Sequence, residues 1–144
     1  MRLRDVMTRN VEVIPPDASV EQAAERMKAL DVGVLPVCDG ERLVGMLTDR
    51  DITLRATAAG RDPRRTKVSE AMTPDISYCF EDQDVKEAAQ LMEQRQIRRL
   101  VILSRDKRLV GIVSLGDLAV ETRDEKLSGE VLKEVSEPAE PRRQ

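Results

Sequence analysis

The sequence predicts an α+β fold built from two copies of one unit of about 60 residues. The repeat is considered first, because a repeat at a fixed spacing indicates the architecture of the whole fold, whereas local patterns indicate only single elements. The sequence Arg-Leu-Val-Gly at 42–45 returns unchanged at 108–111. In both copies two apolar residues, a hydroxyl residue, two variable residues and an aspartate follow. The start of the unit is repeated too, since Met-Thr occurs at 7–8 and again at 72–73.

We therefore divide the chain of 144 residues into three parts: a first repeat at 1–62, a second repeat at 63–122 and a charged C-terminal tail at 123–144. A short helix is expected in the tail at 130–135. Within each repeat the predicted order is strand, helix, strand, strand, helix.

An amphipathic helix is predicted early in each repeat, because apolar residues recur at the i, i+3, i+4 and i+7 positions. The two stripes are Val20, Ala23, Ala24 and Met27 in the first repeat and Val85, Ala88, Ala89 and Met92 in the second. Ser19 with Gln22, and Asp84 with Glu87, have the spacing of a capping box at the helix start.

Short apolar runs rich in β-branched residues follow each helix and predict buried strands. They lie at 32–38 and 43–47 in the first repeat and at 100–103 and 109–113 in the second. Asp39-Gly40 predicts a tight hairpin turn. An extended segment is expected at 11–14. Thr48 and Ser114 each open a further helix, and the first of these helices is expected to end at Gly60.

Composition excludes several classes of function. The net charge is −3, aromatic residues are 1% and no long run carries one sign, which disfavours nucleic-acid binding. No run is long and apolar enough to span a membrane, and no secretory signal is seen at the start, so a cytoplasmic protein is expected. Without histidine, the chain lacks the commonest general base and metal ligand, so neither an enzyme nor a metal site is expected.

The two cysteines, Cys38 and Cys79, are too few for a four-ligand zinc site. They are expected to be half-buried free thiols. A redox pair is the alternative, which only their separation in the fold decides.

The repeats resemble a pair of CBS domains, the family named after cystathionine β-synthase. The resemblance rests on Met-Thr near the start, an Ala-Ala helix, a Val-Gly-Val-Leu-Pro-Val strand and a Gly-x-x-Thr-Asp-x-Asp end, and it covers about residues 5–120. It implies two repeats packed as a pseudo-twofold pair with a cleft that binds AMP, ADP, ATP, NAD or S-adenosylmethionine. It also implies a homodimer and a regulatory rather than catalytic role.

Thr48 with Asp51, and Ser114 with Asp117, are the candidate ribose-binding residues that the resemblance implies. The chemistry suits them, because one carboxylate can accept hydrogen bonds from both neighbouring hydroxyls of a ribose. A hydroxyl residue followed three places later by aspartate is also a helix cap that needs no ligand. The two interpretations are compatible, since the cap uses backbone donors of the same turn.

Phosphate groups need cations, for which the candidates are Arg50, Arg98 and Arg99. The two copies differ here, because Gly33-Val34 stands where the second repeat has Arg98-Arg99, so unequal sites are expected. Val101 also replaces the family's strand proline. The resemblance places the adenine slot at eight residues: Val11, Val13, Val34, Pro36, Ile76, Tyr78, Ile97 and Leu100.

The sequence thus predicts a regulatory module that binds an adenine nucleotide as a ligand, with no required cofactor, and acts through an unidentified partner protein or its own homodimer. The alternative is a ligand-free CBS-pair scaffold that acts by dimerisation or by binding a partner protein.

Overall fold

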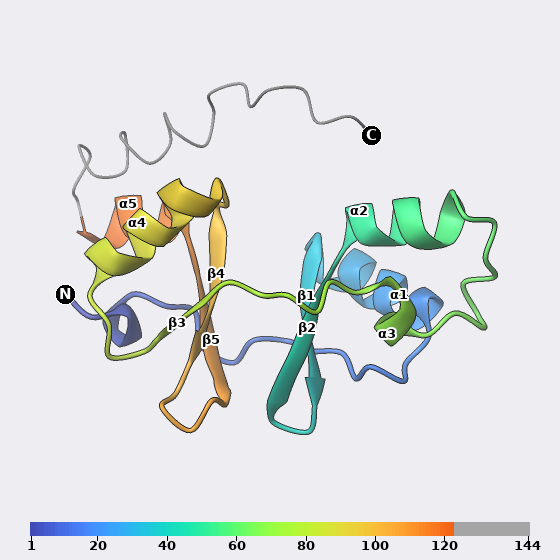
Figure 1. Ribbon diagram of the computed structural model, residues 1–144, viewed down its shortest axis with the longest axis horizontal. Helices are drawn as coiled ribbons and strands as arrows, with labels where there is room; N and C mark the ends of the chain where they lie inside the picture. Colours follow the sequence, from blue (N-terminus) through green and yellow to red (C-terminus); the bar gives the residue numbers. More distant parts are fainter. Residues whose placement is uncertain (123–144) are drawn as a thin grey trace. The chain divides into compact units, whose positions relative to one another are not determined.

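The computed structural model describes residues 1–122, and the helix expected at 130–135 lies outside the described residues. The fold is α+β, as predicted, with a two-stranded sheet β1–β2 and a three-stranded sheet β3–β4–β5 (Figure 1). The elements are η1 (Leu3–Asp5), α1 (Val20–Leu30), β1 (Val34–Asp39), β2 (Arg42–Thr48), α2 (Asp49–Ile52), η2 (Thr53–Thr57), α3 (Val68–Ala71), β3 (Tyr78–Phe80), α4 (Val85–Arg95), β4 (Arg99–Leu103), β5 (Leu109–Ser114) and α5 (Leu115–Thr122).

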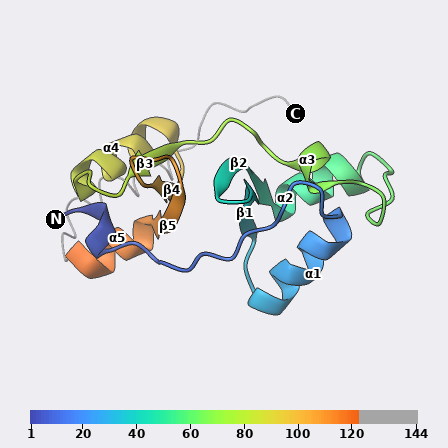
Figure 2. The same cartoon turned by 90° about the horizontal axis from the view of Figure 1, so that it is seen from below.

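The chain folds into two compact units whose boundaries differ from those of the sequence repeats. Among the described residues, unit 1 comprises 1–10, 78–106 and 110–122, and unit 2 comprises 11–77 and 107–109. Each unit therefore combines most of one repeat with the opening segment of the other. In each unit the helices cover one face of the sheet (Figures 1 and 2).

Each unit has an aliphatic core of its own. The core of unit 1 lies between α4, α5, η1 and the sheet, and its most deeply buried members are Leu3, Ala88, Met92, Ile102 and Val113. The core of unit 2 lies between α1, α3 and the β1–β2 sheet, and its most deeply buried members are Val20, Ala23, Val37, Leu47, Val68 and Ala71. Burial of such side chains, at about 25 cal/mol per Å² of apolar surface, is the main force that holds each unit together.

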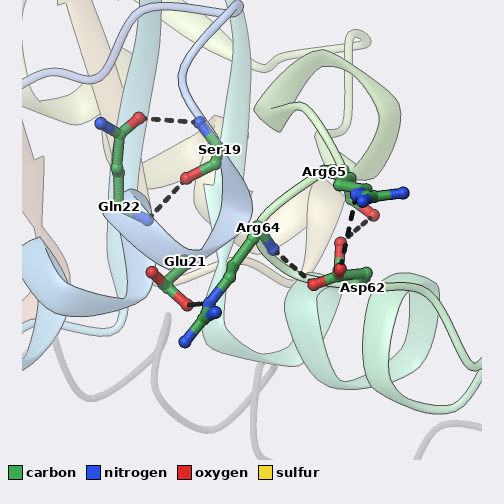
Figure 3. Close-up of polar contacts among 7 residues, drawn as sticks. Ser19, Glu21, Gln22, Asp62, Arg64 and Arg65 are labelled. Atoms are coloured by element: carbon green, nitrogen blue, oxygen red, sulfur yellow. Dashed lines mark hydrogen bonds and ion pairs between the residues drawn. The ribbon is translucent and has the colours of Figure 1, made fainter.

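Helix α1 begins at the predicted capping box. The backbone N–H of Gln22 donates to the Ser19 hydroxyl at 3.1 Å, and that of Ser19 donates to the Gln22 side-chain oxygen at 3.0 Å (Figure 3). The predicted apolar stripe of α1 is wrong at one position. Ala24 is exposed, whereas its counterpart Ala89 in α4 is buried. Helix α1 packs on its unit through the narrower face formed by Val20, Ala23 and Met27.

The capping box predicted at Asp84 does not form. Asp84 does cap α4, but its side chain accepts from the backbone N–H of Lys86 at 2.9 Å. Glu87 does not return a bond to Asp84, because its carboxylate accepts instead from the side-chain amide of Gln83 at 2.7 Å. A neighbouring side-chain donor has therefore replaced the backbone donor that the pattern predicts.

The strand expected at 11–14 is reduced to a single parallel bridge between Ile14 and Val37. The Ile14 N–H donates to the Pro36 carbonyl at 3.0 Å, and the Cys38 N–H donates to the Ile14 carbonyl at 3.1 Å. The ladder stops on both sides of this bridge because neither Pro16 nor Pro36 has an N–H to donate.

The equivalent segment of the second repeat does form a strand. Glu81 stands where the first repeat has Pro16, and its N–H donates to the Leu103 carbonyl at 2.9 Å. Val101 stands where the first repeat has Pro36, and three parallel pairs join β3 to β4. The two replacements together thus give unit 1 a third strand that unit 2 does not have.

The chain after Thr48 remains helical through α2 and η2, and η2 has the wider π-helical turn. Regular helix ends at Thr57, slightly before the predicted end, and a turn carries the chain to Gly60, whose φ of +69° is the left-handed conformation that favours glycine.

The connection at 61–67 is docked on the start of α1. The N–H of Val20 donates to the Thr66 carbonyl at 2.8 Å, and that of Glu21 donates to the Pro63 carbonyl at 3.0 Å. Arg64 lies 3.2 Å from the Glu21 carboxylate (Figure 3). The first amides of α1 therefore already have protein partners, which leaves this helix start unsuited to an anion.

Candidate functional site

The glycine at the end of each Arg-Leu-Val-Gly sequence lies in close contact with a Met-Thr segment. In unit 2, Met46 and Thr73 exchange two backbone hydrogen bonds, at 2.9 and 2.8 Å. A Cβ placed on Gly45 would lie 2.6 Å from the Met72 sulfur and 3.0 Å from the Thr73 carbonyl oxygen. Only glycine lets the Met-Thr segment approach β2 this closely.

Unit 1 has the same arrangement with the repeats exchanged. Thr8 and Ile112 share two backbone hydrogen bonds, at 2.8 and 3.0 Å. A Cβ on Gly111 would lie 2.6 Å from the Met7 sulfur and 2.9 Å from the Thr8 carbonyl oxygen. Each Met-Thr segment therefore pairs with the Arg-Leu-Val-Gly strand of the other repeat.

The junction between β2 and α2 brings Thr48 and Asp51 together. The Asp51 N–H donates to the Thr48 hydroxyl at 3.0 Å, and the Thr48 N–H donates to Oδ2 of Asp51 at 3.0 Å. The junction between β5 and α5 repeats this geometry, with distances of 3.0 and 2.9 Å between Ser114 and Asp117. All four residues are half-buried. Both pairs are thus reciprocal helix caps.

Capping leaves part of each pair available to a ligand. Each carboxylate uses Oδ2 in the cap, and among the hydrogen bonds of residues 1–122 its Oδ1 accepts none. Each hydroxyl accepts one backbone bond and keeps its own proton as a donor. An acceptor oxygen beside a hydroxyl donor is a combination that suits the two hydroxyls of a ribose.

The three candidate phosphate-binding arginines are exposed and divide between the units. Arg50 lies in the first turn of α2, in unit 2, one residue before Asp51. Arg99 is the first residue of β4 and Arg98 precedes it, in unit 1. The Arg98 carbonyl accepts from the Leu115 N–H at 2.8 Å, which holds the Arg98 backbone beside the Ser114 cap.

Part of the predicted adenine slot of unit 2 lies next to the cap. Val34 is opposite Thr48 in the antiparallel β1–β2 ladder, and Pro36 is two residues further along β1. Val11 and Val13 precede the Ile14 bridge on the β1 side of the sheet, whereas Ile76 follows Thr73, which pairs on the β2 side. The structure thus brings Val34 and Pro36 to the cap and places Val13 and Ile76 toward opposite edges of the sheet.

In unit 1, the Leu100 side chain is 1% exposed and belongs to the core, with Ile97 packed against it. Leu100 can therefore offer a ligand only its backbone. Tyr78 is 40% exposed, pairs with Val101 in the β3–β4 ladder and meets Phe80 edge to face at 5.6 Å. Of these residues Tyr78 has the most accessible side chain.

Sequence reasoning missed Arg55, which holds the Met-Thr segment of the second repeat in place. Its guanidinium donates to the carbonyls of Ala71 at 2.9 Å and Met72 at 2.8 Å. No short motif marks this contact. It is visible in the sequence only as a difference between the copies, because Glu121 stands 66 residues later.

Cys38 and Cys79 are free thiols, as expected, but they are buried rather than half-buried, with exposures of 4% and 3%. Burial raises the pKa of both thiols, and for Cys79, where the Glu87 carboxylate adds to the effect, it raises the pKa to about 11. Residues 1–122 contain no group of three or more acidic, cysteine or histidine side chains placed to hold a metal ion. Over the same residues, no helix has the length and apolar character needed to span a bilayer.

Comparison with known proteins identifies the family. The CBS-domain family model matches residues 3–56 and 68–123. The chain is 44% identical over 134 residues to the CBS domain-containing protein YhcV of Bacillus subtilis strain 168, covering 93% of this chain and 94% of that protein. It is 39% identical over 117 residues to hypoxic response protein 1 of Mycobacterium tuberculosis, covering 81% of each.

Solved structures agree with the sequence comparison. The crystal structure of Hypoxic Response Protein I with two coordinated zinc ions is similar with a TM-score of 0.76 and 38% identity, covering 83% of this chain and 98% of that one. The crystal structure of CBSX2 in complex with AMP is similar with a TM-score of 0.72 and 28% identity, covering 87% and 98%. This chain therefore belongs to the CBS-domain family and carries two copies of the domain.

Proposed function

We propose that this chain is a regulatory module that binds an adenine nucleotide at its strand-to-helix junctions and acts on a partner protein or through its own homodimer. The observation that carries the proposal is the reciprocal pair of hydroxyl and carboxylate, present with the same geometry at Thr48–Asp51 and Ser114–Asp117. The similar CBSX2 was solved in complex with AMP, which supports the choice of ligand class.

The chemistry of the proposal is recognition without catalysis. The unused carboxylate oxygen of each pair accepts from a ribose hydroxyl, a charge-assisted bond that is stronger than a neutral one. The exposed arginines of each unit offer cations to a phosphate group: Arg50 in unit 2, and Arg98 with Arg99 in unit 1. The adenine ring is held by backbone groups of the strand before each cap and by neighbouring apolar side chains. The homodimer and the cytoplasmic location expected from the sequence remain predictions.

Thermal unfolding with AMP, ATP, NAD and S-adenosylmethionine tests this function. A ligand at 100 times its dissociation constant adds about 2.7 kcal/mol to the free energy of unfolding, which raises the melting temperature measurably. We expect at least one compound to give this shift. If none of the four changes the melting temperature at millimolar concentration, the ligand-free scaffold is the better account.

A further inference from the structure

The two strand-to-helix junctions share one more backbone contact, and it allows them to be compared residue by residue. In unit 2 the Asp49 N–H donates to the Gly33 carbonyl at 2.9 Å. In unit 1 the Leu115 N–H donates to the Arg98 carbonyl at 2.8 Å. Gly33 and Asp49 are therefore the structural counterparts of Arg98 and Leu115.

This correspondence reveals an opposite balance of charge. In unit 2 the two residues at the start of the strand are Gly33, which precedes β1, and Val34, its first residue. The two that open the helix are Asp49 and Arg50, whose charges cancel. In unit 1 the four counterparts are Arg98, Arg99, Leu115 and Gly116, which carry two positive charges and no negative one. With the capping aspartate included, the junction has one net negative charge in unit 2 and one net positive charge in unit 1.

The Asp49 carboxylate of unit 2 lies directly beside Gly33. A Cβ on Gly33 would lie 2.9 Å from Oδ2 of Asp49, so the carboxylate fills the space where a side chain at position 33 would begin. At the equivalent place in unit 1 the Arg98 side chain begins. The position that carries a cation in unit 1 is thus filled by an anion in unit 2.

We propose that the two junctions select different classes of adenosine compound, and that Asp49 and Arg98 determine the selection. The junction of unit 2 prefers an adenosine compound without phosphate, either neutral or cationic, because the Asp49 carboxylate repels phosphate and offsets the charge of Arg50 in the same turn. The junction of unit 1 takes a phosphorylated one. This inference rests on the proposed function, since it assigns ligands to the same two sites.

Adenosine, AMP and S-adenosylmethionine are suitable probes, because all three share the nucleoside and differ in charge. A phosphate monoester carries nearly two negative charges at neutral pH. Calorimetric titration is done in two backgrounds, Asp117→Asn to leave the unit 2 site and Asp51→Asn to leave the unit 1 site. Into these we introduce Asp49→Asn and Arg98→Gln. The controls Asp106→Asn and Arg65→Gln make the same charge changes at exposed positions away from the junctions.

In the Asp117→Asn background we expect adenosine or S-adenosylmethionine to bind more tightly than AMP. Asp49→Asn should then strengthen AMP binding roughly tenfold while adenosine changes less than about twofold, because only the phosphate interacts with this charge at short range. In the Asp51→Asn background we expect AMP to be preferred, and Arg98→Gln should weaken it roughly tenfold with little effect on adenosine. Both effects should shrink as salt is raised.

The outcomes separate this inference from the proposed function. The key quantity is the ratio of the affinity for AMP to the affinity for adenosine. If Asp49→Asn and Arg98→Gln change this ratio no more than their controls do, the selectivity is overturned, while nucleotide binding itself is not affected. Failure of these three probes, and of ATP and NAD, to bind the unmutated protein would overturn both.

Discussion

Gly45 lies so close to Met72 that a Cβ at this position would come 2.6 Å from the methionine sulfur. Gly111 and Met7 have the same relationship in the other unit. These contacts give a packing reason for the glycine in both copies of Arg-Leu-Val-Gly. The repeated Arg-Leu-Val-Gly sequence therefore lies where the opening segment of one repeat contacts the strand of the other. The ligand-binding proposal depends instead on the hydroxyl–aspartate pairs that follow this sequence.

Substitution of Gly45 by alanine is expected to destabilise unit 2. The flexible Met72 side chain can move away from a new methyl group, but the Thr73 carbonyl, at 3.0 Å, is backbone. Forcing an extra methyl into such a contact costs about 1–3 kcal/mol, so the melting temperature should fall by several degrees. Gly116→Ala is the control, because the nearest atom to its Cβ would be 3.6 Å away and alanine favours helix. Equal melting temperatures for the two variants would contradict this packing role.

Val101→Pro is expected to shorten the β3–β4 ladder of unit 1 at its Tyr78 end, because it introduces one of the two prolines that limit the ladder in unit 2. Proline at this position removes an N–H from β4, as Pro36 does in β1, and the β3–β4 pairing should shrink. Hydrogen exchange of the Cys79 amide, which lies next to position 101 in the ladder, should accelerate, while that of Glu81, whose N–H donates to the Leu103 carbonyl, should change less. The control Val101→Ala shortens the side chain but keeps the N–H. Equal protection in the proline and alanine variants would show that the N–H does not set the strand length.

Local patterns predicted much of this fold because they are decided by residues close in sequence. Four features depend on neighbours within one or two turns: the Ser19–Gln22 cap, the stripe of α4, the Asp39-Gly40 hairpin and the left-handed turn at Gly60. The local predictions were wrong where a neighbouring residue changed the hydrogen bonds that the pattern implies. The Gln83 side-chain amide donates to the Glu87 carboxylate, which is therefore not used in a capping box. Two prolines without an N–H limit the strand at Ile14 to one bridge.

Long-range pairing was the part that the sequence could not supply. The exchange of Met-Thr segments between repeats joins Thr8 to Ile112 and Thr73 to Met46, and no local preference specifies either pair. The Arg55 contact with the Met72 carbonyl is hidden for the same reason. For the site, the sequence singled out both hydroxyl–aspartate pairs, which the structure brings together as caps. The contrast between Asp49 and Arg98 needed the backbone contacts that make Gly33 the counterpart of Arg98 and Asp49 that of Leu115.

Thiol reagents are expected to modify neither cysteine while the protein is folded. Burial raises the pKa of Cys38 and raises that of Cys79 to about 11, so at pH 8 little thiolate is present in either position. Since folding favours the neutral thiol, the stabilisation from Cys79 is complete below its unfolded pKa of about 8.5 and is lost as pH rises from there toward 11. Ellman's reagent at pH 8 should label both thiols only after denaturation. Fast labelling of the native protein would show that these side chains are accessible.

Light scattering tests the expected homodimer. The chain has a mass of 16.2 kDa, and we expect a particle of about twice that mass at micromolar concentration, as the family resemblance implies. A clean monomer at that concentration would remove the dimer from the proposed mechanism and leave a separate partner protein as the route of regulation.

The most direct test of nucleotide binding is calorimetric titration of Asp51→Asn and Asp117→Asn with AMP and ATP, alongside melting curves without ligand. Asparagine keeps a side-chain oxygen for the cap but removes the charge that the ribose hydroxyls would meet. A hydrogen bond to a charged group contributes about 1.5–3 kcal/mol, so each change should weaken binding at its own site roughly tenfold or more. We expect the larger loss from Asp117→Asn, whose unit also carries Arg98 and Arg99, and only a small fall in melting temperature, since even a lost cap costs about 0.5–2 kcal/mol. Unchanged affinity together with lowered melting temperatures would mean that these aspartates are helix caps alone and would contradict the account.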